Sequence, residues 1–158
     1  RNGKGSEAML LVSGCLLGID CKYNSKNNRH DALMAYLAGK KFVIVCPEQL
    51  GGLPTPRSPA EICGGDGRDV LRGKARVISR AGKDVTENFL KGARETLKIA
   101  QLLGIKKAIF KERSPSCGSR EIYDGTFSGR VVAGCGVTTA LLREKGIEVY
   151  GDDGIGAW

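Results

Sequence analysis

The 158-residue sequence contains a single histidine and few aromatic residues, and these shortages argue against several kinds of site. Because His30 stands alone, a zinc finger and a cysteine–histidine protease are both disfavoured. Aromatic residues make up 6% of the chain and do not alternate with basic ones, which argues against a base-stacking surface for single-stranded nucleic acid. No apolar run approaches the ~20 residues that a membrane-spanning helix needs, so we expect no membrane association.

Cysteine is present, but the paired spacing that marks common cysteine sites is missing. The chain has six cysteines and no Cys-x-x-Cys pair, which disfavours a zinc ribbon or a thioredoxin-type redox motif. The first eight residues lack the apolar centre of a secretory signal, so we expect a cytoplasmic protein with reduced thiols rather than a disulfide framework. We expect an added or disordered start over 1–8, one domain over 9–151 and a C-terminal tail over 152–158.

Basic residues outnumber acidic ones, and the excess is spread along the chain. The 25 Lys and Arg residues against 17 Asp and Glu residues give a formal net charge of +8. Such a balance can reflect an anionic partner or merely a solvated surface. Since the basic residues are not clustered, we expect no dedicated nucleic-acid-binding domain, and a small anionic ligand is the more plausible functional interpretation.

Apolar segments alternate between strand-like and helix-like patterns. Helices are predicted where apolar residues recur at helical spacing and a glycine follows, and strands where short apolar runs precede loops. The expected strands cover 9–13, 42–45, 107–110 and 147–150, and the expected helices 29–39, 84–103 and 136–146. A long irregular segment, 49–73, holds three of the five prolines. This alternation predicts a single α/β domain whose mostly parallel sheet has helices on both faces.

Three of the cysteines directly follow predicted strands. Cys15, Cys46 and Cys117 would all lie at the carboxyl edge of a parallel sheet, where open α/β sheets bind ligands. Converging thiolates suit a soft metal or an iron–sulfur cluster. Cysteines also commonly fill protein cores, and position alone leaves both interpretations open. The loops favour the cluster, because glycine, or glycine together with proline, lies near each cysteine and backbone N–H groups in such turns can hydrogen-bond cluster sulfides.

Four segments resemble the thiouracil desulfidase family in order and spacing, and the resemblance covers essentially residues 9–150. They read SGCLLGIDCKYN, VCPEQLGGLPTPR, SPSCGSREIYDGTFSG and AGCGVTTALLREKGIEV. The resemblance implies a Rossmann-like three-layer α/β sandwich. It also implies a 4Fe-4S cluster that is held by Cys15, Cys46 and Cys117 and leaves one iron open. The implied reaction is a non-redox hydrolysis that converts a thio-pyrimidine to its oxo form and hydrogen sulfide. Candidate substrates are 2-thiouracil, 4-thiouracil, 4-thiouridine and its monophosphate.

Candidate catalytic and substrate-binding residues lie beside these cysteines. Glu48 is the nearest carboxylate for a general base, although a surface or capping role is the alternative. Ser114 and Ser116 can hydrogen-bond the pyrimidine or relay a proton, or simply stabilise a turn; the family resemblance favours Ser114. Arg57 and Lys111 can orient a carbonyl or a phosphate, unless they are merely solvated.

The remaining candidates are assigned structural roles. Cys63 and Cys135 are expected to be structural, and so is Cys21, although its spacing from Cys15 brings it close to the site. Asp124 is expected to be a turn residue in a loop that can cover the pocket. His30 is expected to open a helix at the surface.

The sequence also allows alternative functions, and two of its segments depart from the family pattern. The cluster can instead serve a redox sensor or a sulfur carrier, or the protein can remove sulfur from tRNA. KYNSKNN after Cys21 and the terminal DDGIGAW depart from the family pattern, and both bear on substrate choice.

Overall fold

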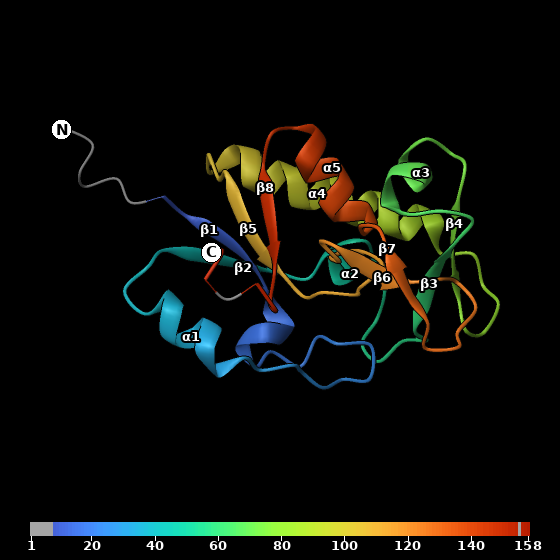
Figure 1. The fold of residues 1–158 in the computed structure, drawn as a ribbon, viewed down its shortest axis with the longest axis horizontal. Coiled ribbons are helices and arrows are strands. Elements are labelled where there is room, and N and C mark those ends of the chain that lie inside the picture. The colour runs from blue at the N-terminus through green and yellow to red at the C-terminus, as the bar shows by residue number, and fades with distance from the viewer. Residues whose placement is uncertain (1–7, 155) are drawn as a thin grey trace.

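Four short strands form a parallel sheet at the centre of the molecule (Figure 1). The computed structural model describes residues 8–154 and 156–158, so most of the predicted start over 1–8 lies outside the described residues. The strands are β1 (Leu10–Ser13), β2 (Phe42–Val45), β5 (Lys107–Phe110) and β8 (Glu148–Gly151), in the order β2-β1-β5-β8. Every neighbouring pair is parallel, so all four strands end at the same edge.

Helices cover both faces of this sheet. Because side chains alternate along a strand, Leu10 and Val12 pack on one face and Leu11 on the other. The first face is covered by α1 (Asp31–Leu37), and the second by α4 (Thr86–Leu102) and α5 (Val137–Glu144) (Figure 1). The predicted α/β fold class, with a mostly parallel sheet in a single domain, is confirmed.

A smaller group of elements packs beside the sheet on the same long helix. Two antiparallel strand pairs belong to it, and a core that includes Ile62, Phe89 and Ile122 joins them to α4. The pairs are β3 (Ala60–Cys63) with β4 (Arg76–Ser79), and β6 (Glu121–Tyr123) with β7 (Val131–Ala133). The 3-10 helix η1 (Gly14–Leu17), α2 (Pro47–Leu50) and α3 (Gly67–Leu71) complete the fold.

Two sequence expectations differ from the observed elements, and the C-terminal tail makes contacts that no expectation addressed. Segment 49–73, expected to be irregular, contains β3 and α3. The helix expected from residue 84 begins at Thr86, because the Asp84 side chain accepts the Thr86 N–H and turns the chain first. Tail residue Trp158 packs against the rings of His30 and Tyr36 and donates its indole N–H to the Gly151 carbonyl.

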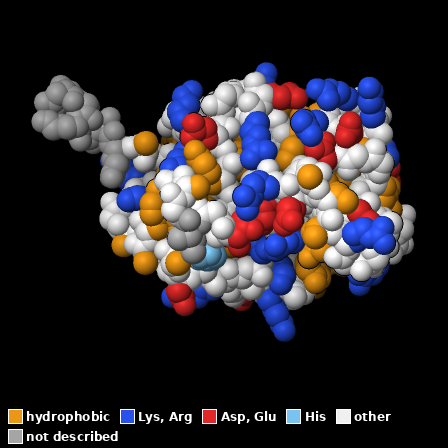
Figure 2. Space-filling view, viewed as in Figure 1, with side chains coloured by type: hydrophobic (Ala, Val, Ile, Leu, Met, Phe, Trp, Pro, Cys, Tyr) orange, Lys and Arg blue, Asp and Glu red, His pale blue; other side chains and the backbone are white. Residues whose placement is uncertain are grey.

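Two further properties of the fold concern the length of its helices and the distribution of charge on its surface. No helix within the described ranges has both the length and the apolar character needed to cross a membrane. Lys and Arg side chains are scattered over the face shown in Figure 2 and interrupted by Asp and Glu, rather than gathered in one stripe.

Candidate active site

The carboxyl edge of the sheet opens into a cavity of about 590 Å³ that four cysteines line, among them the three predicted ligands. Cys15 lies in η1 after β1, Cys46 is the N-cap of α2 after β2, and Cys117 follows β5. Cys117 is buried, whereas Cys15 and Cys46 are half-buried. The parallel sheet therefore brings together cysteines that are 31 and 71 positions apart.

The Ser114–Ser119 loop that carries Cys117 is stabilised from within by its first serine. The Ser114 hydroxyl oxygen accepts the N–H groups of Ser116 and Cys117, each at 3.1 Å. The Ser114 carbonyl accepts the N–H of Gly118 at 2.9 Å. Ser114 therefore stabilises this turn, because its hydroxyl oxygen accepts N–H groups that no backbone carbonyl of the loop reaches.

The N-terminus of α5 holds the other side of this loop. The carbonyl of Pro115 accepts the N–H of Val137, and that of Ser116 accepts the N–H groups of Thr138 and Thr139. These loop carbonyls thus satisfy N–H groups that a helix N-terminus leaves free. The positive end of the helix dipole consequently faces the loop of Cys117, where it favours negative charge.

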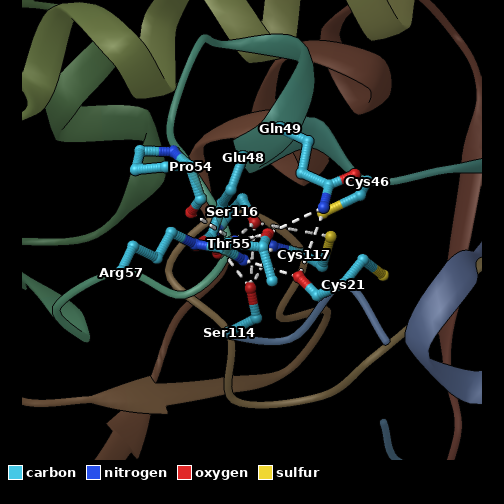
Figure 3. A network of polar contacts seen from close by, with 10 residues as sticks. All are labelled: Cys21, Cys46, Glu48, Gln49, Pro54, Thr55, Arg57, Ser114, Ser116 and Cys117. Carbon is cyan, nitrogen blue, oxygen red and sulfur yellow. Dashed lines mark hydrogen bonds and ion pairs between the residues drawn. The ribbon is translucent and has the colours of Figure 1, made fainter. Parts of the chain in front are cut away.

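Glu48 links the loops of Cys46 and Cys117 through its two carboxylate oxygens (Figure 3). Oε2 accepts a hydrogen bond from the Ser116 hydroxyl at 3.0 Å, and Oε1 accepts one from Nε of Arg57 at 2.9 Å. The Ser114 and Ser116 hydroxyl oxygens are 2.9 Å apart. Because Ser114 already accepts two N–H groups, its hydrogen is directed to Ser116, which donates in turn to Glu48. The three side chains therefore form a directed hydrogen-bond chain.

Arg57, predicted to bind substrate, uses its guanidinium within the protein. Besides Glu48, it donates to the carbonyls of Pro54 and Cys21 and to the Thr55 hydroxyl. Its side chain is only 7% exposed. Arg57 thus holds Glu48 in place from the side opposite Ser116.

Lys111 lines the cavity, as its predicted role requires. Its Nζ donates to the carbonyl of Glu112 at 3.0 Å, and its N–H donates to the hydroxyl of Ser13 at 3.0 Å. The ammonium group therefore lies at the cavity wall, where its charge can act on a bound molecule.

The cysteines that line the cavity differ in acidity. Interaction with the Cys21 thiol lowers the pKa of the Cys46 thiol, against the opposing effect of burial. Burial raises the pKa of Cys15 and of Cys117. Cys46 is therefore the most readily ionised of the three predicted cluster ligands.

Two buried carboxylates that the sequence analysis did not select hold the loops around the cavity. Glu112 is 1% exposed, and its carboxylate accepts the N–H groups of Ser119, Arg120 and Glu121 and the Ser119 hydroxyl. Burial opposes ionisation, but these hydrogen bonds prevail and lower the pKa of Glu112. Glu61, 8% exposed, accepts two N–H groups of the β6–β7 loop. The sequence signal that could have identified them is an acidic residue within or just after an apolar strand, because Glu61 lies within β3 and Glu112 follows β5.

The remaining candidates divide between the cavity and other parts of the fold. Cys21 is buried and lines the cavity, as its spacing from Cys15 suggested. Cys63 contacts the Gly125 carbonyl, and Cys135 lies against Asp66. Asp124 accepts the N–H and hydroxyl of Thr126, which is the turn role predicted for it. His30 accepts the Leu33 N–H as the N-cap of α1.

Comparison with known proteins gives one consistent result. The model of the family described as 2-thiouracil desulfurase matches residues 10–153. The Bacillus subtilis (strain 168) protein named "Uncharacterized protein YbbK" is 48% identical over 145 residues, which are 92% of this chain and 96% of that protein. The solved structure of the 4Fe-4S-dependent thiouracil desulfidase TudS is 40% identical, with a TM-score of 0.83, and the match covers 96% of this chain and 95% of that one.

Proposed function

Because the chain belongs to the 2-thiouracil desulfurase family, we propose that it is a 4Fe-4S-dependent desulfidase that hydrolyses a thio-pyrimidine. The products are the oxo-pyrimidine and hydrogen sulfide, so water supplies the new oxygen and no electron transfer is needed. The substrates that we propose are 2-thiouracil, 4-thiouracil, 4-thiouridine and its monophosphate. Six free cysteines suit a reducing compartment, and a cytoplasmic location is part of the proposal.

The cavity suits a cluster better than a single metal ion. In the parts of the chain that the structure describes, no three His, Cys, Asp or Glu side chains are grouped closely enough to hold one ion. A cluster makes a different demand, because each cysteine binds its own iron around the body of the cluster. Cys15, Cys46 and Cys117 line the same 590 Å³ cavity, as does Cys21, and we propose as ligands the three that follow strands of the parallel sheet.

A cluster held by three cysteines would supply an open iron, a Lewis acid that polarises a C=S group. The chain's own residues then have to manage water and protons. Each Glu48 oxygen accepts one hydrogen bond and keeps further acceptor capacity, so the carboxylate can take a proton from water. Ser116 and Ser114 extend this path away from Glu48, and Lys111 can contact a carbonyl or phosphate of the substrate.

The observation that carries this proposal is the position of Glu48 between two cysteine loops. Glu48 lies in α2, whose N-cap is Cys46, and its carboxylate hydrogen-bonds the residue that precedes Cys117. Arg57 orients this carboxylate through Nε, and we infer that this is its main contribution. A general base is efficient only when held within hydrogen-bond reach of the proton that it abstracts, which this arrangement favours.

A sulfide-release assay on the anaerobically reconstituted protein tests the proposal. Each of the four candidate thio-pyrimidines is incubated with the protein, and hydrogen sulfide and the oxo-pyrimidine are quantified. Equal amounts of both products support hydrolysis. Reversible reduction of the cluster without sulfide release would favour the redox-sensor alternative, and release from thiolated tRNA alone would favour the tRNA alternative.

A further inference from the structure

The loop between β6 and β7 forms a wall of the candidate active site. Tyr123, Phe127 and Gly129 from this hairpin line the same cavity as the cysteines. Among these residues, Phe127 presents an apolar ring that none of the proposed chemical steps uses. The loop follows Cys117 by seven to thirteen residues, and the packing of β6 against β3 holds it at the cavity.

A buried carboxylate fixes the backbone of this loop. Oε1 of Glu61 on β3 accepts the N–H of Gly125 at 2.9 Å and that of Phe127 at 3.1 Å. The Cys63 thiol contacts the Gly125 carbonyl at 3.5 Å. A Cβ atom at Gly125 would lie 2.6 Å from the Ile62 carbonyl oxygen, so the loop approaches β3 too closely for a side chain there.

Phe127 adopts a backbone conformation that aromatic residues rarely take. Its φ angle is 56°, in the left-handed region that disfavours residues with a Cβ atom. Such conformations persist where the surroundings hold them, and they cluster at functional sites. Here the hydrogen bond from the Phe127 N–H to Glu61 stabilises this backbone conformation.

Arg80 supports the ring. Its guanidinium carbon lies 5.4 Å from the centroid of the Phe127 ring, and Arg80 also lines the cavity. Within the described ranges, no carboxylate forms an ion pair with Arg80. Aromatic rings and guanidinium planes are the two protein surfaces on which nucleobases stack.

We propose that the Phe127 ring, supported by Arg80, is the surface on which the pyrimidine ring of the substrate stacks. This inference rests on the proposed function, because it assumes a planar thio-pyrimidine in the cavity. Tyr23 also lines the cavity, but it is 39% exposed and belongs to the exposed segment 23–26. The rigid anchoring through Glu61 is what distinguishes Phe127 as the stacking residue.

The test compares Phe127→Ala, Phe127→Leu and Phe127→Tyr with the wild-type protein. The dissociation constant of 2-thiouracil is measured by calorimetry, and KM and kcat are measured by sulfide release. Removing a stacking aromatic weakens base binding by roughly 5- to 150-fold, so Phe127→Ala should raise the dissociation constant and KM by that factor. Phe127→Leu keeps apolar volume but lacks a π-face and should show most of the loss. Phe127→Tyr should remain within about threefold of wild type.

Controls separate a failure of this inference from a failure of the proposed function. Val132→Ala changes the same hairpin at a residue that is 40% exposed and outside the cavity lining, and it should bind like wild type. Unchanged cluster absorption would show that the Phe127 variants keep an intact site.

If wild type releases sulfide but Phe127→Ala and Phe127→Leu bind 2-thiouracil as tightly as wild type does, the stacking surface alone is refuted. If wild type neither binds nor converts any thio-pyrimidine, both proposals fall. Should Phe127→Ala not fold, the contrast between the Leu and Tyr variants decides.

Discussion

The Glu48 carboxylate has one side-chain partner on each oxygen, and both partners come from loops at the cavity. This arrangement fixes the carboxylate in a half-buried position, with the Arg57 guanidinium paired to one oxygen and the uncharged Ser116 hydroxyl to the other. A carboxylate held in this way keeps acceptor capacity for a water molecule. The proposed chemistry therefore depends most directly on a single carboxylate.

Replacing that carboxylate separates proton transfer from cofactor binding. Glu48→Gln keeps the size of the side chain and hydrogen-bonding atoms for Arg57 and Ser116, so iron content should match wild type. Loss of a general base should lower kcat by roughly 10²- to 10⁴-fold. Glu144→Gln, an exposed change on α5, is the matched control. Wild-type turnover by Glu48→Gln, measured as sulfide release, would remove Glu48 from the mechanism.

A second substitution distinguishes two roles of Arg57, the positioning of Glu48 and the direct binding of substrate. Arg57→Lys keeps the charge but cannot reproduce the four contacts that the guanidinium makes. If Arg57 acts by holding Glu48, kcat should fall about tenfold or more while KM changes little. A raised KM with an unchanged kcat, measured over a range of 2-thiouracil concentrations, would instead indicate a direct substrate contact.

Among the elements, the Ser114–Ser119 loop is held by contacts with two other parts of the fold. The Glu112 carboxylate accepts the N–H groups of the loop's last residue, Ser119, and of the two residues that follow, and the N-terminus of α5 donates N–H groups to the loop's carbonyls. Donors and acceptors of the loop are thus satisfied by two different elements. Cys117 lies between these two attachments, so its position is set by the fold and not by its own side-chain contacts alone.

Removing the Glu112 carboxylate should destabilise the protein. Glu112→Ala leaves three N–H groups without their acceptor, and each buried unpaired group costs about 1–3 kcal/mol. We therefore expect the free energy of unfolding, measured with urea, to fall by at least about 3 kcal/mol. A fall below about 1 kcal/mol would show that water or a neighbouring group replaces the carboxylate.

The ionisation of Glu112 also predicts how stability depends on pH. Its pKa is lower in the folded protein than in the unfolded chain, so its stabilising effect is present above the unfolded pKa and is lost as pH falls through the folded one. Between pH 6 and pH 3 the stability of wild type should therefore fall more steeply than that of Glu112→Gln. Parallel thermal-unfolding profiles of the two proteins across this range would contradict the assignment.

Over the whole molecule, the sequence allowed the sheet and its cysteines to be predicted, because these depend on local pattern. Short apolar runs identified β1, β2 and β5, and parallel pairing places the residues after them at one edge. Glu112, Glu61 and the internal contacts of Arg57 were not predicted. Their partners are backbone N–H and carbonyl groups of distant segments, and such groups carry no sequence signature. Strands β3 and β6 were missed for a related reason, since each is short and is stabilised by tertiary packing.

The central claim is that Cys15, Cys46 and Cys117 together hold a cluster that hydrolysis requires. The most direct test measures iron and acid-labile sulfide per chain after anaerobic reconstitution, in wild type and in Cys15→Ala, Cys46→Ala and Cys117→Ala. Cys63→Ala is the matched control, because Cys63 does not line the cavity. We predict about four irons and four sulfides in wild type and in the control, with loss in each of the three variants. An iron-free wild-type protein, or full iron content in any of the three variants, would contradict the account.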